Sequence, residues 1–120
     1  MSRRIRPDSP QEWLNRAHSD LSLAHVKRKE VYLEDLCFHA QQASEKAVKA
    51  LLIEYNVEFP YVHDIGSLLT LLENTGLVIP IRIKQVEKLT KYAVFTRYPG
   101  IAPQIQKNEY KKAVKLAERI

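Results

Sequence analysis

Six residues of this 120-residue chain have side chains suited to holding a nucleotide or a short RNA segment. An arginine offers a planar fork that matches phosphate, and a tyrosine offers a ring on which a base can stack. The candidate nucleotide-binding residues are His39, Lys46, Lys49, Tyr92, Arg97 and Tyr98. Each also has an ordinary structural interpretation: the lysines can face solvent, and Arg97 can pair with Glu34 or Asp35. Residue types alone leave both interpretations open.

Other kinds of reactive site are not indicated. The four histidines form no His-Glu-x-x-His pair, and the single cysteine, Cys37, cannot build a thiolate site, so we expect neither a metal nor a cofactor. The three glycines are too scattered for a phosphate-binding loop. No Ser-His-Asp arrangement is signalled either, and we therefore assign no catalytic residue.

A central helix is expected to position three of the six candidates. Apolar residues recur at steps of three and four through residues 33–52, which is the spacing of one buried helix face. They are Leu33, Leu36, Cys37, Ala40, Ala43, Ala47 and Leu51. A polar stripe follows the other side, and it consists of His39, Gln42, Lys46 and Lys49. Because alanines let a neighbouring helix approach closely, we place this helix at the centre of a bundle.

The remaining segments also read as helices, so the predicted fold is an all-α, up-and-down bundle of four to five helices. Ser9, Pro10 and Glu12 fit a capping box with proline at the first helical position. Asp64 fits an N-cap, and Gly76 suits a left-handed helix end. The expected helices span residues 10–27, 33–56, 64–76, 80–96 and 108–120. Their expected inward residues include Leu14, Ala17, Leu21 and Ala24 on the first helix and Tyr110, Ala113, Val114, Ala117 and Ile120 on the fifth.

Charge is unevenly distributed along the chain, whose net charge is +5. Residues 1–80 carry nine basic and eleven acidic residues (−2), whereas residues 81–120 carry ten and three (+7), which together give +5. The last third therefore fits an anionic partner, although a solvated helix face explains it equally well. We expect one helical domain at residues 9–120 after a flexible basic tail at residues 1–8. A lone cysteine on an apolar stripe and no membrane-length apolar run favour a cytoplasmic protein without membrane contact.

One family shares a pattern with this chain. The pattern consists of DLCFHAQQASEKAVKALL at 35–52, FP at 59–60, HD at 63–64, LL at 68–69 and RYP at 97–99. In these residues the chain resembles the HEPN domain, the higher eukaryote and prokaryote nucleotide-binding family, from Trp13 to Ala117. The resemblance implies a helical bundle that commonly dimerises. In prokaryotes it also implies frequent partnership with a separately encoded minimal nucleotidyltransferase, often as a toxin-antitoxin pair.

The chain departs from the ribonuclease motif of that family, in which an arginine is followed after four to six residues by a histidine. No histidine follows Arg97. Arg16 precedes His18 too closely and His25 too distantly for the motif. A missing histidine removes a general base or acid that is typically worth about a hundredfold or more in rate.

The resemblance therefore favours a nucleotide- or RNA-binding module that assists a minimal nucleotidyltransferase. One alternative is a metal-independent ribonuclease toxin that combines Arg97 with His39 or His63, and another is a purely structural partner subunit. A homodimer is expected both from the resemblance and from surplus apolar residues at 77–79 and at Phe59, which can form an interface.

Overall fold

The computed structural model describes residues 9–93 and 104–120, and within these ranges the chain forms helices and connections without a strand. The helices are α1 (Pro10–Ala24), α2 (Leu33–Glu54), α3 (Ile65–Glu73), α4 (Ile81–Lys84), the 3₁₀ helix η1 (Gln85–Ala93) that continues α4, and α5 (Lys107–Glu118). The prediction of an all-helical bundle is confirmed. None of the described helices is both long enough and apolar enough to cross a membrane.

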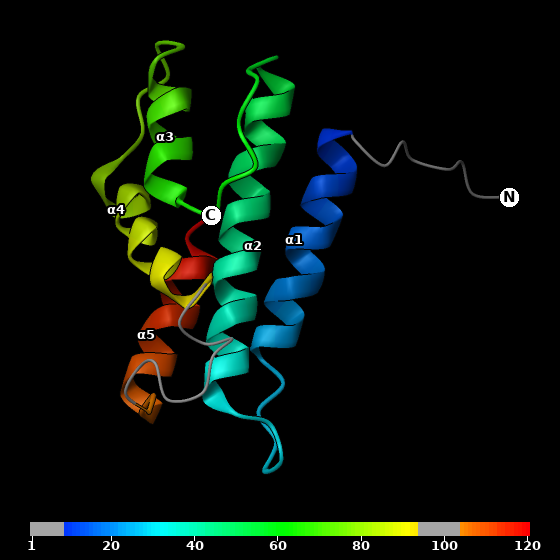
Figure 1. Cartoon of the computed structure of the whole chain (residues 1–120), viewed down its shortest axis with the longest axis vertical. Coiled ribbons are helices and arrows are strands. Elements are labelled where there is room, and N and C mark those ends of the chain that lie inside the picture. Colours follow the sequence, from blue (N-terminus) through cyan, green and yellow to red (C-terminus); the bar gives the residue numbers. More distant parts are fainter. Residues whose placement is uncertain (1–8, 94–103) are drawn as a thin grey trace, which may run out of the picture.

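The longest helix, α2, runs through the middle of the molecule (Figure 1). In that view α1 lies along one side of α2, while α3, α4 and α5 lie on the other. Ala17 and Ala24 of α1 and Ala40 of α2 are all buried, as expected where small side chains allow two helices to approach closely. The predicted central position of this helix is therefore confirmed.

Three predicted inward residues are on the surface. Leu51 is 41% exposed because its neighbour Leu52, which is fully buried, takes the core position in that turn of α2. Leu14 is 38% exposed, and Ile120 lies beyond the end of α5 and is 40% exposed. The other inward residues predicted on the fifth helix are buried. The predictions thus fail mainly near helix ends, where fewer neighbours cover each side chain.

The sequence predicts one α-helix from residue 80 to 96, of which residues 94–96 lie outside the described residues. The described part begins as α4 and becomes a 3₁₀ helix in η1. A 3₁₀ helix has three residues per turn, so side chains three apart lie on the same side. Val86, Leu89 and Tyr92 have this spacing and are all buried. The pattern of apolar residues therefore suits the tighter helix, which the usual α-helical period did not predict.

Two predicted helix starts and one predicted turn are confirmed. The Ser9 hydroxyl accepts a hydrogen bond from the Glu12 amide (3.1 Å), and Asp64 accepts one from the Gly66 amide (3.1 Å). Only half of the predicted capping box forms, because the Glu12 carboxylate bonds to Arg16 instead (3.1 Å). Gly76 has a φ of 97°, a conformation that glycine adopts readily.

The apolar residues expected to be surplus are largely used in the fold. Phe59 packs edge-on against Trp13, with ring centroids 6.5 Å apart, and Ile79 belongs to the hydrophobic core. Val78 and the neighbouring Ile81 stay on the surface, 87% and 76% exposed. The expected apolar surface is therefore smaller than predicted, and it is centred on these two residues.

Candidate functional site

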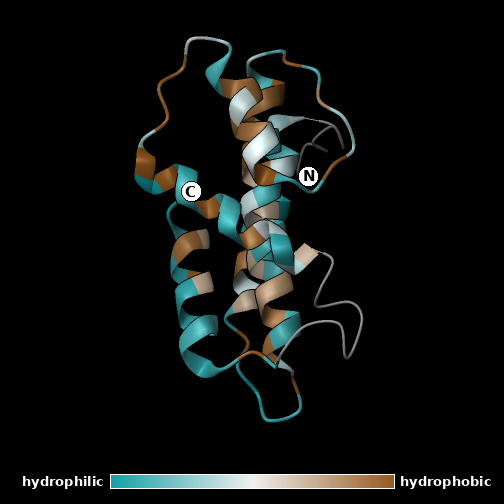
Figure 2. Ribbon diagram, turned by 60° about the vertical axis from the view of Figure 1, so that its left-hand side comes forward, coloured by the Kyte–Doolittle hydropathy of each residue, from teal (hydrophilic) through white to brown (hydrophobic). Residues whose placement is uncertain are grey.

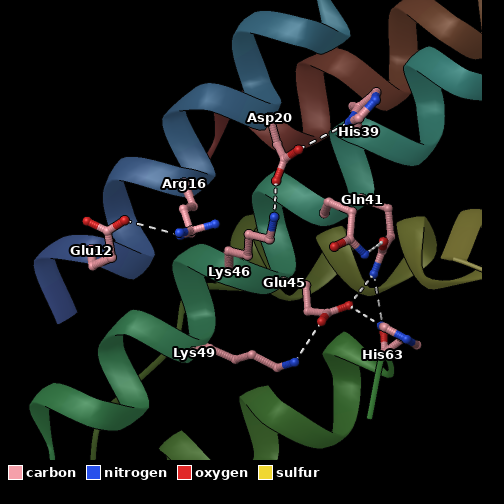
Figure 3. Close-up of polar contacts among 10 residues, drawn as sticks. Glu12, Arg16, Asp20, His39, Gln41, Glu45, Lys46, Lys49 and His63 are labelled. Atoms are coloured by element: carbon pink, nitrogen blue, oxygen red, sulfur yellow. Dashed lines mark hydrogen bonds and ion pairs between the residues drawn. The ribbon is translucent and has the colours of Figure 1, made fainter. Parts of the chain in front are cut away.

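A buried carboxylate between α1 and α2 brings together two of the predicted site residues. Asp20 lies on the inward side of α1 and is 7% exposed. One of its oxygens is 3.1 Å from His39 Nδ1, and the other accepts a hydrogen bond from Lys46 Nζ at 2.6 Å (Figure 3). His39 and Lys46 are seven residues apart, about two helical turns, so both reach Asp20 from the same side of α2.

The contact with Asp20 determines which part of the imidazole of His39 is available. When Nδ1 donates its proton to the carboxylate, Nε2 is the nitrogen left to accept a proton or contact a ligand. The side chain of His39 is about a third exposed, at 32%. An imidazole oriented in this way by a carboxylate is the arrangement used by many general bases.

A second buried carboxylate, Glu45, lies further along α2 and has three partners (Figure 3). It is 2.7 Å from Lys49 Nζ, 2.7 Å from Gln41 Nε2 and 2.8 Å from His63 Nδ1. Burial raises the pKa of the Glu45 carboxyl, but hydrogen bonds from these partners and the positive charge of Lys49 outweigh it, so its pKa lies below the usual value. Glu45 is therefore held as a carboxylate inside the protein.

Lys49 is a buried cation and not part of an exposed basic stripe. The whole residue is 5% exposed, and its ammonium lies 5.6 Å from the centre of the Trp13 ring and 5.7 Å from that of Phe59. Aromatic ring faces attract cations, so these rings stabilise the ion pair with Glu45. In this structure Lys49 is thus enclosed by groups of the protein itself.

The contacts of Glu45 also attach the start of α3 to α2. His63 bonds to Glu45 through its ring, and its carbonyl oxygen lies 3.5 Å from Gln41 Nε2. The next residue, Asp64, is the N-cap of α3. The HAQQ, EK and HD segments of the sequence pattern therefore supply the polar contacts that hold α1, α2 and α3 together.

Of the other predicted site residues, Lys49 and Tyr92 are described, and neither joins His39 and Lys46 at Asp20. Tyr92 is 5% exposed, and its hydroxyl donates a hydrogen bond to Glu109 at 2.5 Å, so its ring lies in the core and does not offer a stacking surface. Arg97 and Tyr98 lie outside the described residues. Among the residues that are described, no group of three or more His, Cys, Asp or Glu side chains is placed to hold a metal ion.

Helix α5 carries a basic surface whose residues are not among the six predicted candidates. Basic residues occur at every fourth position of this helix and its C-cap, with one more lysine beside them, and all are exposed. They are Lys107, Lys111, Lys112, Lys115 and Arg119, and we call them the α5 basic row. In Figure 2 α5 lies at the lower left, and its ribbon is largely in the hydrophilic colour. The four-residue spacing is readable in the sequence and could have identified this surface.

The acidic residues of α5 are turned towards other elements. Glu109 contacts the hydroxyl of Tyr92 and lies 3.9 Å from the ammonium of Lys91, and Glu118 lies 3.7 Å from the imidazole of His25. Within the described ranges, the lysines of the α5 basic row have no ion-pair partner. Their charges are therefore available to an external anion.

Comparison with known proteins identifies the family. The sequence profile of the HEPN domain matches residues 10–120. The chain belongs to the HEPN family. This HEPN domain is similar to the crystal structure of ST0689, an archaeal HEPN homologue, with 28% identity, a TM-score of 0.73, and coverage of 92% of this chain and 90% of that one. It is also similar to the crystal structure of TT1696 from Thermus thermophilus, with 28% identity, a TM-score of 0.77 and coverage of 93% and 92%. A search of curated proteins gave no significant match.

Proposed function

We propose that this HEPN domain is a nucleotide- or RNA-binding module that works with a separately encoded minimal nucleotidyltransferase, as in a toxin-antitoxin pair. The observation that carries the proposal is the α5 basic row, whose lysines are exposed and have no ion-pair partner among the described residues. Clustered cations on one helix attract phosphate groups and accelerate their association with the protein.

The sequence that joins η1 to α5 supports the same proposal. Arg97 and Tyr98 belong to this connection, which is continuous with Lys107 at the start of α5. We therefore propose that Arg97 contacts phosphate and that Tyr98 contacts a base, while His39 and Lys46 contribute where Asp20 leaves their donors accessible. Replacing Arg97 with alanine is expected to weaken binding by about 1 to 3 kcal/mol, the range for a charge-assisted hydrogen bond.

A pair of charge-reversed variants tests the binding function. Lys111→Glu with Lys115→Glu reverses two charges of the α5 basic row, and Lys27→Glu with Lys29→Glu reverses two exposed charges in the connection between α1 and α2. Both variants change the net charge from +5 to +1, so they differ only in where the charge is lost. Fluorescence anisotropy with a labelled RNA should show binding about tenfold weaker for the first variant and little changed for the second. Equal effects from both variants would contradict a binding surface on α5.

We also propose that the domain forms a homodimer and binds its nucleotidyltransferase through a protein–protein interface. Val78 and Ile81 support this part, because both are large aliphatic residues that are exposed within four residues of the chain, and clustered exposed apolar residues are typical of contact surfaces. Light scattering should give twice the chain mass of 13.9 kDa. Val78→Ser with Ile81→Ser should shift the mass towards that of a monomer, and a monomeric wild type would refute the dimer. Mixing with a purified minimal nucleotidyltransferase should give a larger complex.

A second candidate function, a metal-independent ribonuclease, is favoured by the contact between His39 and Asp20. That contact directs one imidazole nitrogen away from the carboxylate, as a general base requires. The test is cleavage of RNA in the presence of a chelator by the wild type, by His39→Ala and by His18→Ala, the last of which replaces an exposed histidine of α1. Cleavage that is lost only in His39→Ala would establish this function, whereas the missing arginine-to-histidine spacing predicts little cleavage by any of the three.

A further inference from the structure

We infer that the α5 basic row binds the phosphate backbone of an extended nucleic-acid strand about four nucleotides long, and not a single nucleotide. The inference rests on the proposed function and specifies the ligand of that surface. Lys107, Lys111, Lys115 and Arg119 are four residues apart, so neighbouring side chains are separated by about 6 Å along the helix axis and the whole row spans about 18 Å. Successive phosphates of an extended strand are separated by a similar distance, whereas one nucleotide could meet only one or two of these residues.

The stability of α5 explains the row only at its C-terminal end, where Lys115 and Arg119 complement the helix dipole. Like charges four residues apart destabilise a helix, while an acid and a base at this spacing stabilise it. The row places basic residues next to each other on successive turns of the helix at 107 and 111, at 111 and 115, and at 115 and 119. Both acidic residues of the helix, Glu109 and Glu118, interact with residues of other elements. The repulsion within the row is not offset by ion pairs of its lysines among the described residues, and bound phosphates would offset it.

The last member of the row is held in place by the fold. Arg119 Nη1 donates hydrogen bonds to the carbonyl oxygen of Arg82 (3.1 Å) and to Gln85 Oε1 (2.7 Å). These bonds leave Nε and Nη2 free to donate, and the residue is exposed. A guanidinium fixed in this way loses less conformational freedom when it binds phosphate. The backbone of α4 therefore sets one end of the proposed binding track.

Bases are expected to contribute little at this surface. The two tyrosines in the described parts of η1 and α5, Tyr92 and Tyr110, are both buried. Without an exposed tyrosine in the described parts of these two helices, the row itself has charge but no stacking platform, so binding to the row should depend on strand length and salt and not on base sequence. RNA and DNA strands of equal length should accordingly bind with similar affinity.

A series of fluorescein-labelled oligouridylates of two, four, eight and twelve nucleotides tests the inference by anisotropy, with uridine monophosphate as a competitor. The wild type should bind the tetranucleotide at least about tenfold more tightly than the dinucleotide, and the monophosphate should compete poorly. Lys111→Gln with Lys115→Gln, which adds no new charge, should remove most of this difference. The matched pair Lys27→Gln with Lys29→Gln should retain it.

Two other outcomes separate this inference from the proposed function. The inference fails while nucleotide binding stands in either of two cases. The monophosphate competes as well as the tetranucleotide does, or Lys27→Gln with Lys29→Gln weakens binding as much as Lys111→Gln with Lys115→Gln does. If no oligonucleotide and no nucleotide binds to the wild type, the proposed function itself fails. A thermal melt of each variant, expected to match the wild type, shows whether lost binding reflects lost structure.

Discussion

The ion pair between Glu45 and Lys49 should be a main determinant of stability, and Glu45→Gln tests this. The substitution keeps the size of the side chain and removes its charge. It leaves the ammonium of Lys49, whose side chain is only 6% exposed, without its counter-ion. Removing one partner of a buried ion pair typically costs about 3–5 kcal/mol.

The expected cost is at the lower end of that range. The rings of Trp13 and Phe59 near Lys49 continue to attract its charge, which offsets part of the loss. We therefore expect Glu45→Gln to lower the free energy of unfolding by about 3 kcal/mol. For a domain of this size, each kcal/mol shifts the melting temperature by roughly 3–5 °C, so the melting temperature should fall by roughly 10–15 °C.

Chemical denaturation at several pH values measures this cost and its pH dependence. The pKa of Glu45 is lower in the folded than in the unfolded protein, so its stabilising effect is complete above the usual glutamate pKa of about 4.3 and is lost as the pH falls through the folded value. The difference between the wild type and Glu45→Gln should accordingly be largest near neutral pH and should shrink in acid.

Glu54→Gln is the matched control, because Glu54 belongs to the same helix and is exposed. It should change stability by less than about 0.5 kcal/mol. If Glu45→Gln lowers the melting temperature no more than Glu54→Gln does, the ion pair is not a main determinant of stability. A double-mutant cycle with Lys49→Met should also show that the two substitutions together cost less than the sum of their separate costs.

Three further substitutions or reactions test other parts of the fold. Gly76→Ala should lower the free energy of unfolding by about 1 kcal/mol, since residue 76 has a φ of 97°, and a chemical denaturation curve with an unchanged midpoint would contradict this. Tyr110→Phe should cost about 1–3 kcal/mol in the same assay, because the buried hydroxyl donates to the Ala24 carbonyl oxygen at 2.6 Å. Burial raises the pKa of the Cys37 thiol to about 12, so a thiol reagent at pH 8 should modify it only in denaturant, and rapid labelling of the native protein would be inconsistent with this environment.

The fold was largely predictable because its signals are local. A helix period, a capping residue such as Ser9 or Asp64, and a glycine such as Gly76 act over a few neighbouring residues, and each can be read from the sequence. The 3₁₀ geometry of η1 was not predicted, since steps of three also occur within an α-helical pattern. At the ends of α2 and α5, the burial of Leu51 and Ile120 depends on which distant elements cover them.

The site was less predictable because its contacts join residues far apart in the chain. Lys49 belongs to a polar stripe in the sequence, and its burial depends on Trp13 and Phe59, which lie outside α2. Asp20 has a usable signal, since it falls between Ala17 and Ala24 on the inward side of the first helix, where a carboxylate needs partners. The identity of those partners required the packing of α1 against α2.

The salt dependence of RNA affinity is the sharpest test of whether the α5 basic row binds a nucleic-acid backbone. A strand that contacts three to four cations should give a plot of log affinity against log salt with a slope of about −2 to −3, because single strands contribute about −0.7 for each contact. Lys111→Gln with Lys115→Gln should make that slope less steep by about 1.4, whereas Lys27→Gln with Lys29→Gln should leave it unchanged. A slope near zero for the wild type, or equal slopes for the wild type and the α5 variant, would show that the α5 basic row does not bind a nucleic-acid backbone.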